Sequence, residues 1–177
     1  MYPAEICIYL TGSNNPRVDV GAFSLSIKDD PMSAFIGKIK CNEAVAPIRE
    51  GFIRVFEILE NEDIDAKILI ITTDRSLHTR IEQTLDRQSR RDRGISVPAK
   101  NQEDRWVQAS NRYFSFKPGI RESSSDAESR RLRALKKVAR QCWKGVPFTP
   151  GTDIRSLPED EGRFAERVRD FLRRRDQ

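Results

Sequence analysis

Basic side chains gather in two short segments of this chain, and such side chains can bind phosphate groups. The first segment carries Arg87, Arg90, Arg91 and Arg93. The second segment, in a predicted helix, carries Arg130, Arg131, Arg133, Lys136, Lys137 and Arg140. Cations that neutralise phosphates release counterions, so clusters of this kind bind nucleic-acid backbones without reading a sequence. The two segments therefore predict a phosphate-contacting surface.

Positive charge is concentrated in the second part of the chain. Residues 1–74 carry 12 acidic and 7 basic residues, whereas residues 75–100 carry 7 basic and 3 acidic ones, and residues 112–144 carry 10 and 3. The net charge of +5 hides this asymmetry. A nucleic-acid partner, RNA or an RNA/DNA duplex, fits this distribution. The alternative is that the cations only form solvated helix faces that balance the acidic first part.

The two tryptophans bear on the same question. Trp106 and Trp143 could stack on bases. Core packing is the expected role of each, because a large aromatic ring contributes most when it is buried.

Other chemistries find little support in the sequence. Ser13, His78 and Asp74 could be written as a catalytic triad, but nothing places Ser13 on the sharp turn that a nucleophile needs. Gly12 and Gly21 lack the spacing of a phosphate-binding glycine loop. The single histidine, His78, lies in a predicted helix and is expected at the surface.

The composition predicts one globular domain with a real core. The chain has 177 residues, of which 37% are hydrophobic and 33% are charged. No apolar run approaches the roughly 20 residues of a membrane span, and the start lacks the pattern of a signal peptide. Cys7, Cys41 and Cys142 are scattered and lack metal-ligand spacing. We expect an intracellular protein, cytoplasmic or nuclear, with no membrane partner.

The first 74 residues alternate between strand and helix patterns. Strands are predicted at residues 5–11, 20–27 and 35–41, where β-forming residues end at clusters of turn residues. A helical stripe follows, formed by Ile48, Phe52, Val55, Phe56 and Leu59. Residues 67–73 (KILIITT) are apolar throughout, which is typical of a central strand buried on both faces.

The second part continues in the same manner. Helices are predicted at residues 75–87, 101–109 and 126–142, with a fifth strand at residues 112–117 (RYFSFK). Residues 144–158 are rich in proline and glycine and predict a linker. An amphipathic helix at 159–175 directs Phe164, Val168, Phe171 and Leu172 inward. We therefore predict a domain at 1–143, and a linker with a C-terminal helix at 144–177 packed on or next to it.

This order of elements resembles the ribonuclease H fold over about residues 4–142. Local support comes from residues 11–16 (TGSNNP) with 21–23 (GAF), which look like the first hairpin of that family, and from residues 72–74 (TTD), which look like the end of its fourth strand. The resemblance implies an α/β fold with a five-stranded mixed sheet, in the order β-β-β-α-β-α-α-β-α, flanked by helices. A C-terminal helical extension follows it here.

The resemblance also implies a chemistry and a set of ligands. Ribonucleases H cleave RNA with two divalent cations held by clustered carboxylates. The first carboxylate position corresponds to Thr11 and the second to Ile48, neither of which is acidic. The third position matches Asp74. Asp126 is the candidate for the fourth, with Glu128 beside it, and Glu43 or Glu50 could replace the second only after a shift in helix register.

Each of these acids also has a simpler role. Asp74 follows a strand and precedes a helix, which is a common place for a helix cap. Asp126, after three serines, is also expected to cap a helix. Glu43 and Glu50 are typical solvated helix residues. The metal site is therefore expected to be weak or absent.

Three functions remain open at this point. We favour a ribonuclease H-like domain that binds nucleic acid without cleaving it, as part of a nucleoprotein complex, with no cofactor. The second is an active Mg²⁺- or Mn²⁺-dependent endoribonuclease that uses Asp74, Asp126 and either Glu43 or Glu50. The third is a protein-interaction scaffold that binds its partner through an exposed apolar patch around Phe164 and Phe171.

Overall fold

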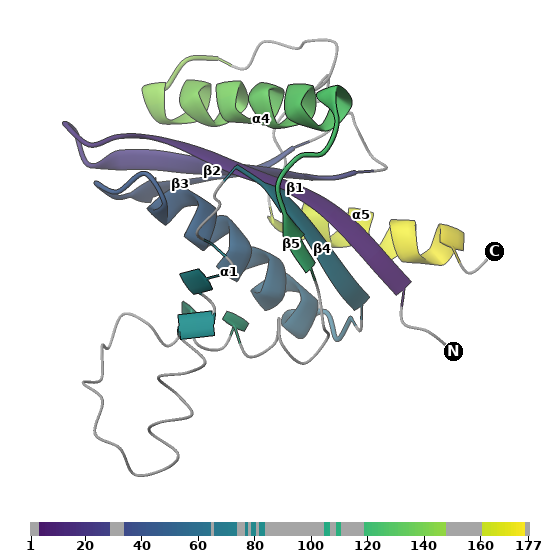
Figure 1. The fold of residues 1–177 in the computed structure, drawn as a ribbon. Helices are drawn as coiled ribbons and strands as arrows, with labels where there is room; N and C mark the ends of the chain where they lie inside the picture. The colour runs from purple at the N-terminus through teal and green to yellow at the C-terminus, as the bar shows by residue number, and fades with distance from the viewer. Residues whose placement is uncertain are drawn as a thin grey trace.

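The fold is built around a five-stranded mixed sheet (Figure 1). The computed structural model describes residues 4–28, 34–64, 66–73, 119–147 and 161–175, together with residues 77, 79, 80, 82, 83, 105, 106, 109 and 110. The strands are β1 (Ala4–Asn15), β2 (Val20–Ile27), β3 (Phe35–Lys40), β4 (Ala66–Thr72) and β5 (Gly119–Arg121). They lie in the order β3-β2-β1-β4-β5, as the predicted fold requires.

Strand β1 is the central strand of the sheet. It pairs antiparallel with β2, which pairs antiparallel with β3, and it pairs parallel with β4, which pairs parallel with β5. Its pairing with β4 ends at Leu10 opposite Thr72, whereas its pairing with β2 continues to Asn15 opposite Val20. The β1–β2 hairpin therefore extends beyond the end of β4, and at this end β1 continues four residues past the predicted strand at 5–11.

Three helices cover the two faces of the sheet. Helix α4 (Asp126–Lys144) lies across one face, and α1 (Ala46–Asn61) lies across the other (Figure 1). Helix α5 (Glu161–Arg175) packs on the α1 side, since its buried residues belong to the same core cluster as those of α1. No helix in the described residues is long and apolar enough to cross a membrane.

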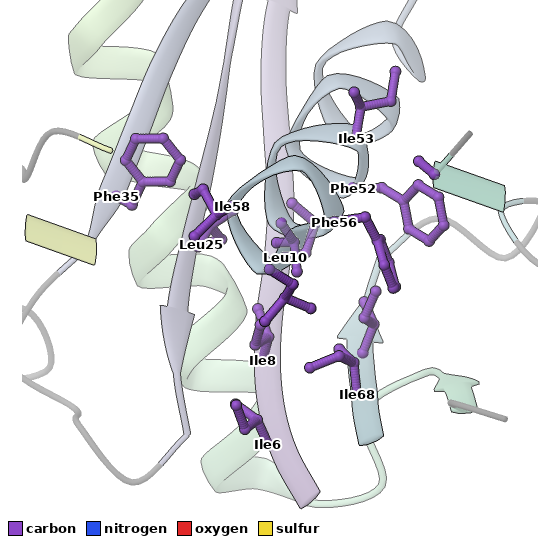
Figure 2. Close-up of a cluster of buried hydrophobic side chains, with 14 of the residues drawn as sticks. Ile6, Ile8, Leu10, Leu25, Phe35, Phe52, Ile53, Phe56, Ile58 and Ile68 are labelled. Atoms are coloured by element: carbon purple, nitrogen blue, oxygen red, sulfur yellow. The ribbon is translucent and has the colours of Figure 1, made fainter. Parts of the chain in front are cut away.

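The core between α1 and the sheet confirms the predicted helical stripe. Ile48, Phe52, Val55, Phe56 and Leu59 are all buried. They pack against side chains of β1, β2, β3 and β4, several of which are shown in Figure 2. The period of the stripe was readable because a helix buried on one side repeats its apolar residues every three or four positions.

A second, smaller core lies between the sheet and α4. Leu132, Leu135 and Val138 of the helix pack with Tyr9 of β1 and Ile71 of β4. Strand β4 thus contributes to both cores, as its continuous apolar sequence indicated. Odd-numbered residues of β1 face α4, because alternate side chains of a strand point to opposite faces.

The fifth strand differs from the expectation. It consists of Gly119–Arg121, paired with residues 69–71 of β4, whereas residues 112–117, where the strand was predicted, lie outside the described residues. Of the predicted helix at 75–87, the described residues 77, 79, 80, 82 and 83 are helical. Of the one predicted at 101–109, the described residues 105, 106 and 109 are helical, as is residue 110.

Helix α5 covers the α1 face of the sheet beside α1. The ring of Phe164 stacks on Phe35 of β3 with 5.4 Å between centroids, and Phe164 and Val168 are almost fully buried. Phe171 and Leu172 are partly buried against the same core. The four residues predicted to face inward do so, and the exposed apolar patch that the scaffold hypothesis required at Phe164 is not there.

Removing the Phe164 ring should destabilise the whole domain. We expect Phe164→Ala to lower the free energy of unfolding by about 3–5 kcal/mol, because a buried aromatic ring is lost and a cavity remains. Phe171→Ala, at a partly buried site, should cost less. Urea denaturation of both variants checks this. If Phe164→Ala left the main unfolding transition unchanged, α5 would be a separate unit rather than part of the core.

Candidate functional site

Thr11 and Thr73 meet where β1 passes the end of β4. Their Oγ1 atoms share a hydrogen bond at 3.1 Å, and Thr11 is fully buried. Thr73 directly precedes Asp74, which lies outside the described residues. The position expected to hold a first carboxylate therefore holds a neutral hydroxyl that is already satisfied by another hydroxyl.

Ile48 lies beside the same part of β1. A Cβ atom added to Gly12 would come within 3.3 Å of Ile48 Cγ1 and 2.7 Å of Pro47 Cβ, so the start of α1 sits directly against the strand. Ile48 is buried and belongs to the core. The sequence alignment of Ile48 with a carboxylate position thus puts an apolar side chain next to Thr11–Gly12.

Glu50 is held by arginines on the outer side of α1. Its carboxylate lies 3.0 Å from Nη2 of Arg105 and 3.3 Å from Nε of Arg54. Glu57, about two turns further along the helix, also binds Arg105, and this hydrogen bond is the main cause of a raised pKa for the Arg105 guanidinium. Glu50 therefore serves an ion-pair network and does not turn toward Thr11.

Glu43 belongs to a different part of the molecule. It is exposed, in the turn before α1, and its charge together with that of Asp19 adds to the burial that raises the pKa of the Cys41 thiol. Asp19 lies in the turn between β1 and β2, and Cys41 N donates to its carbonyl oxygen at 3.0 Å. Glu43 thus sits by the hairpin turn, several residues along the sheet from Thr11.

The two acidic residues in the first turn of α4, Asp126 and Glu128, have different roles. Ser125, not Asp126, is the N-cap, and its hydroxyl accepts from the Glu128 backbone N at 3.2 Å. Asp126 is exposed in the first helical turn, where a negative charge is favoured by the helix dipole. The expected capping role of Asp126 is therefore corrected to Ser125.

Glu128 is a buried carboxylate whose acceptor sites are filled. It receives both Nη atoms of Arg121 at 2.7 and 2.8 Å, the Ser124 backbone N at 2.9 Å and the Ser124 hydroxyl at 3.1 Å, with Lys28 Nζ at 3.6 Å. The bonds from Arg121, with those from Ser124, hold the pKa of Glu128 well below its ordinary value although burial acts in the opposite sense. This carboxylate joins α4 to β5 and β2.

A stripe of cations runs along the other side of α4. Arg133, Lys136, Lys137 and Arg140 are spaced by three or four residues, so they share one helix face. All four are exposed or partly exposed, and none pairs with an acidic side chain in the part of the chain that the structure describes. We call these four residues the α4 cations.

The α4 cations border a pocket against the hairpin. Its volume is about 460 Å³, and its remaining lining residues are Ser13, Asn14, Asn15, Pro16 and Trp143. Trp143 donates from Nε1 to Ser13 Oγ at 2.9 Å, which joins the end of α4 to β1. Core packing was expected for both tryptophans. Trp106 is 2% exposed and packs on Phe52, as expected, but Trp143 is only half-buried.

The remaining predicted phosphate-binding residues divide into three groups. Arg130 is exposed on α4 but does not line the pocket. Arg131 is 8% exposed and has a partner, so it is not offered to a ligand. Arg87, Arg90, Arg91 and Arg93 lie outside the described residues.

Several solved structures share this architecture. The protease–reverse transcriptase of a foamy virus superimposes with a TM-score of 0.57 at 13% identity, over 82% of this chain and 96% of that one. LC9-RNase H1, a type 1 RNase H with the type 2 active-site motif, gives 0.55 at 12% identity, over 97% and 85%. The N-terminal RNase H domain of a Mycobacterium tuberculosis protein, fused to maltose-binding protein, gives 0.53 at 12%, over 80% and 97%.

The chain has the ribonuclease H-like fold. The predicted fold class is confirmed by the strand order and by these structures. No protein-family model matches the sequence, and no curated protein matches it. At these identities the similarity shows the fold alone.

The described residues do not fit the two-metal site that ribonucleases H use. Hard divalent cations need several oxygen ligands, most of them charged. Within the described ranges no three acidic, histidine or cysteine side chains come together. In this ribonuclease H-like domain the Thr11 hydroxyl bonds to Thr73, and Ile48 packs against the neighbouring Gly12.

Glu128 should be worth more to stability at neutral pH than in acid. We expect Glu128→Gln to lower the free energy of unfolding by about 2–3 kcal/mol at pH 7, because the Arg121 charge loses its buried partner. The pKa of Glu128 is lowered in the folded state, so its contribution is complete above the ordinary carboxyl pKa of about 4.3 and fades as the pH falls toward the folded value.

Urea denaturation at pH 7 and pH 3 tests this expectation, with the exposed Glu60→Gln of α1 as the matched control. The difference between parent and Glu128→Gln should narrow at pH 3. An equal difference at both pH values would mean that packing rather than charge is lost.

Placing a carboxylate at Thr11 should be costly without metal. We expect Thr11→Asp to be less stable than Thr11→Asn by about 1–3 kcal/mol at pH 7, because the two side chains have nearly the same shape and only one is charged. Burial raises the pKa of such a carboxyl, so the gap should shrink as the pH falls. Thermal denaturation measures it. Equal stabilities would show that the position is solvated and open to a ligand.

Proposed function

We propose that this ribonuclease H-like domain binds nucleic acid through its backbone and does not cleave it. The observation that carries the proposal is the α4 cations, which present four positive charges along one helix face with no acidic partner among the described residues. Such a row neutralises consecutive phosphates and gains free energy from the counterions it displaces. Backbone contacts of this kind set position and affinity but carry no sequence preference.

The fold relatives indicate which nucleic acids to test first. The foamy-virus protease–reverse transcriptase was solved in complex with double-stranded DNA and, in a second structure, with an RNA/DNA hybrid. The second match has a TM-score of 0.53 and covers 20% of that longer chain. An RNA/DNA or RNA duplex is therefore the proposed partner of this domain.

The proposed absence of cleavage rests on Thr11 and Ile48, which stand at two of the expected carboxylate positions. Two-metal hydrolysis needs carboxylates to hold the ions and to activate water. A threonine hydroxyl and an isoleucine side chain cannot supply these charges. Glu50 is paired with Arg105 and Arg54, and Glu43 lies by the hairpin turn, so neither is placed to replace them.

Such a domain would act as the binding subunit of a nucleoprotein complex. It would supply affinity for the nucleic-acid backbone, while catalysis, where the complex has any, would come from another component. The two basic segments define the surface to be tested: the α4 cations and the arginines at 87, 90, 91 and 93. The latter remain a prediction from sequence.

Binding should depend steeply on salt. We expect the parent to bind an RNA/DNA hybrid with log K falling linearly with log salt, by a slope of roughly −0.7 to −0.9 for each phosphate contacted. Replacing Arg133, Lys136 and Lys137 by Gln should weaken binding and flatten the slope by about two units if most of the three contact phosphates. Replacing the arginines at 87, 90, 91 and 93 by Ser should act in the same direction.

The matched control removes exposed cations from another helix. Arg173→Gln with Arg174→Gln on α5 changes the net charge without touching the proposed surface, and it should leave the slope unchanged. No cleavage of the hybrid is expected in millimolar Mg²⁺ or Mn²⁺. Cleavage that disappears in Asp74→Asn would establish the nuclease alternative, and a parent that fails to bind at low salt would overturn the proposed function.

A further inference from the structure

We propose that the pocket between the β1–β2 hairpin and α4 is a subsite for single-stranded nucleic acid, in which the α4 cations hold the phosphates and Trp143 stacks on a base. The inference deepens the proposed function, because it names a strand state and a subsite within the binding surface. To the α4 cations, on which the proposed function rests, it adds Trp143 and residues 13–16 of the hairpin.

The pocket has two chemically different walls. One wall is the helix face formed by Arg133, Lys136, Lys137 and Arg140. The other is the end of β1 and the start of the hairpin turn, residues 13–16 (SNNP), which are uncharged and, except for the proline, polar. A polyanion with polar sugars and bases has groups that match both walls.

The hairpin wall offers donors and acceptors at fixed positions. Asn15 Oδ1 accepts from the backbone N of Arg17 at 3.1 Å, and this bond fixes the Asn15 amide at the mouth of the turn. The side-chain NH₂ of an amide fixed through its oxygen is left as a donor. Residues 13–16 were recognised in the sequence only as a fold marker, yet they also form this wall.

Trp143 is oriented in advance. Its Nε1–H bond to Ser13 Oγ fixes one edge of the indole on β1, while the side chain remains half-buried and lines the pocket. Lys144 Nζ lies over the ring, 5.8 Å from its centroid, near the distance limit of a cation–π contact. A ring held in this way loses little side-chain entropy on binding, which favours affinity.

Positive potential extends from the pocket toward β3. The charge of Lys38 acts on Cys142 of α4, where it opposes the rise in the pKa of the thiol that burial causes. Lys38 itself is exposed. A nucleic-acid strand bound along α4 would therefore meet the charge of Lys38 near the end of the helix. An extended backbone could then make a further phosphate contact there.

An aromatic ring in a basic pocket selects single strands over duplexes. Bases of a duplex are stacked on each other and shielded by the backbone, whereas unpaired bases can stack on an aromatic side chain. The volume of about 460 Å³ is that of a site for a small group rather than a groove for a helix. A cluster of cations without Trp143 would show no such preference.

The test uses the intrinsic fluorescence of the full chain. The protein has two tryptophans, and Trp106 is buried in the core, so a ligand in the pocket should quench Trp143 alone. We expect single-stranded oligonucleotides, for example a ten-residue oligo(dT) or oligo(U), to quench the parent. A duplex of the same length should bind with much less quenching.

Variants at Trp143 separate stacking from charge. Trp143→Leu should weaken single-strand binding by about 5- to 150-fold, the range expected for one stacked base, and change duplex binding less than about twofold. Trp143→Phe keeps an aromatic face and should retain most of the affinity while losing the quench. Ser13→Ala, which removes the hydrogen bond that orients the indole, should lie between them.

Several results would overturn the subsite. One is unchanged single-strand affinity in Trp143→Leu together with no quench in the parent, and another is equal quenching by a poly-glutamate peptide, which would make the pocket a general anion site. Quenching in the parent requires no folded variant, so the test survives if Trp143→Leu is unstable. If duplexes bind with the expected salt dependence but single strands do not quench Trp143, only this inference is wrong. If the parent binds no nucleic acid at all, the proposed function is wrong.

Discussion

The buried carboxylate of Glu128 fixes the position of α4, and the proposed binding surface depends on that helix. Arg121 and Ser124 hold the carboxylate at the start of the helix, and the Trp143–Ser13 hydrogen bond holds its far end. Between these two polar contacts the apolar residues of α4 pack on β1 and β4. With both ends and one face fixed, the remaining face, which carries the α4 cations, must border the hairpin.

The centre of β1 shows how the same strand can serve a different chemistry. In a ribonuclease H the metal ions offset the charge of the clustered carboxylates, which would otherwise repel the phosphates of the substrate. Here Thr11 is neutral, its hydroxyl is satisfied by Thr73, and four cations of α4 line the pocket beside the hairpin. Under the proposed function, a phosphate backbone approaches this face without any metal ion, which suits binding.

Local sequence periodicity was sufficient for most elements but not for contacts between distant residues. Strands β2 and β4 and the stripe of α1 were predictable because burial imposes a period of two, a continuous apolar run, or a period of 3.6. Strand β5 was not predictable, because Gly119–Arg121 is short and is defined by its pairing with β4. The neighbouring segment RYFSFK shows an alternation of polar and aromatic residues and so attracted the prediction. Nor could the sequence reveal that Trp143 meets Ser13, 130 residues away, so the pocket and the exposure of Trp143 were missed.

The C-terminal helix α5 covers part of the α1 side of the sheet, which leaves the α4 side as the open binding face. Phe164 stacks on Phe35, and Phe164, Ala165 and Val168 join the core on the α1 side, so this part of the sheet is closed to a partner. An apolar docking face at Phe164 would require α5 to leave the domain and to expose that core. The α4 side needs no such rearrangement, because its cations and its pocket are already open to solvent. The structure therefore favours a charged partner on the α4 side over an apolar partner on α5.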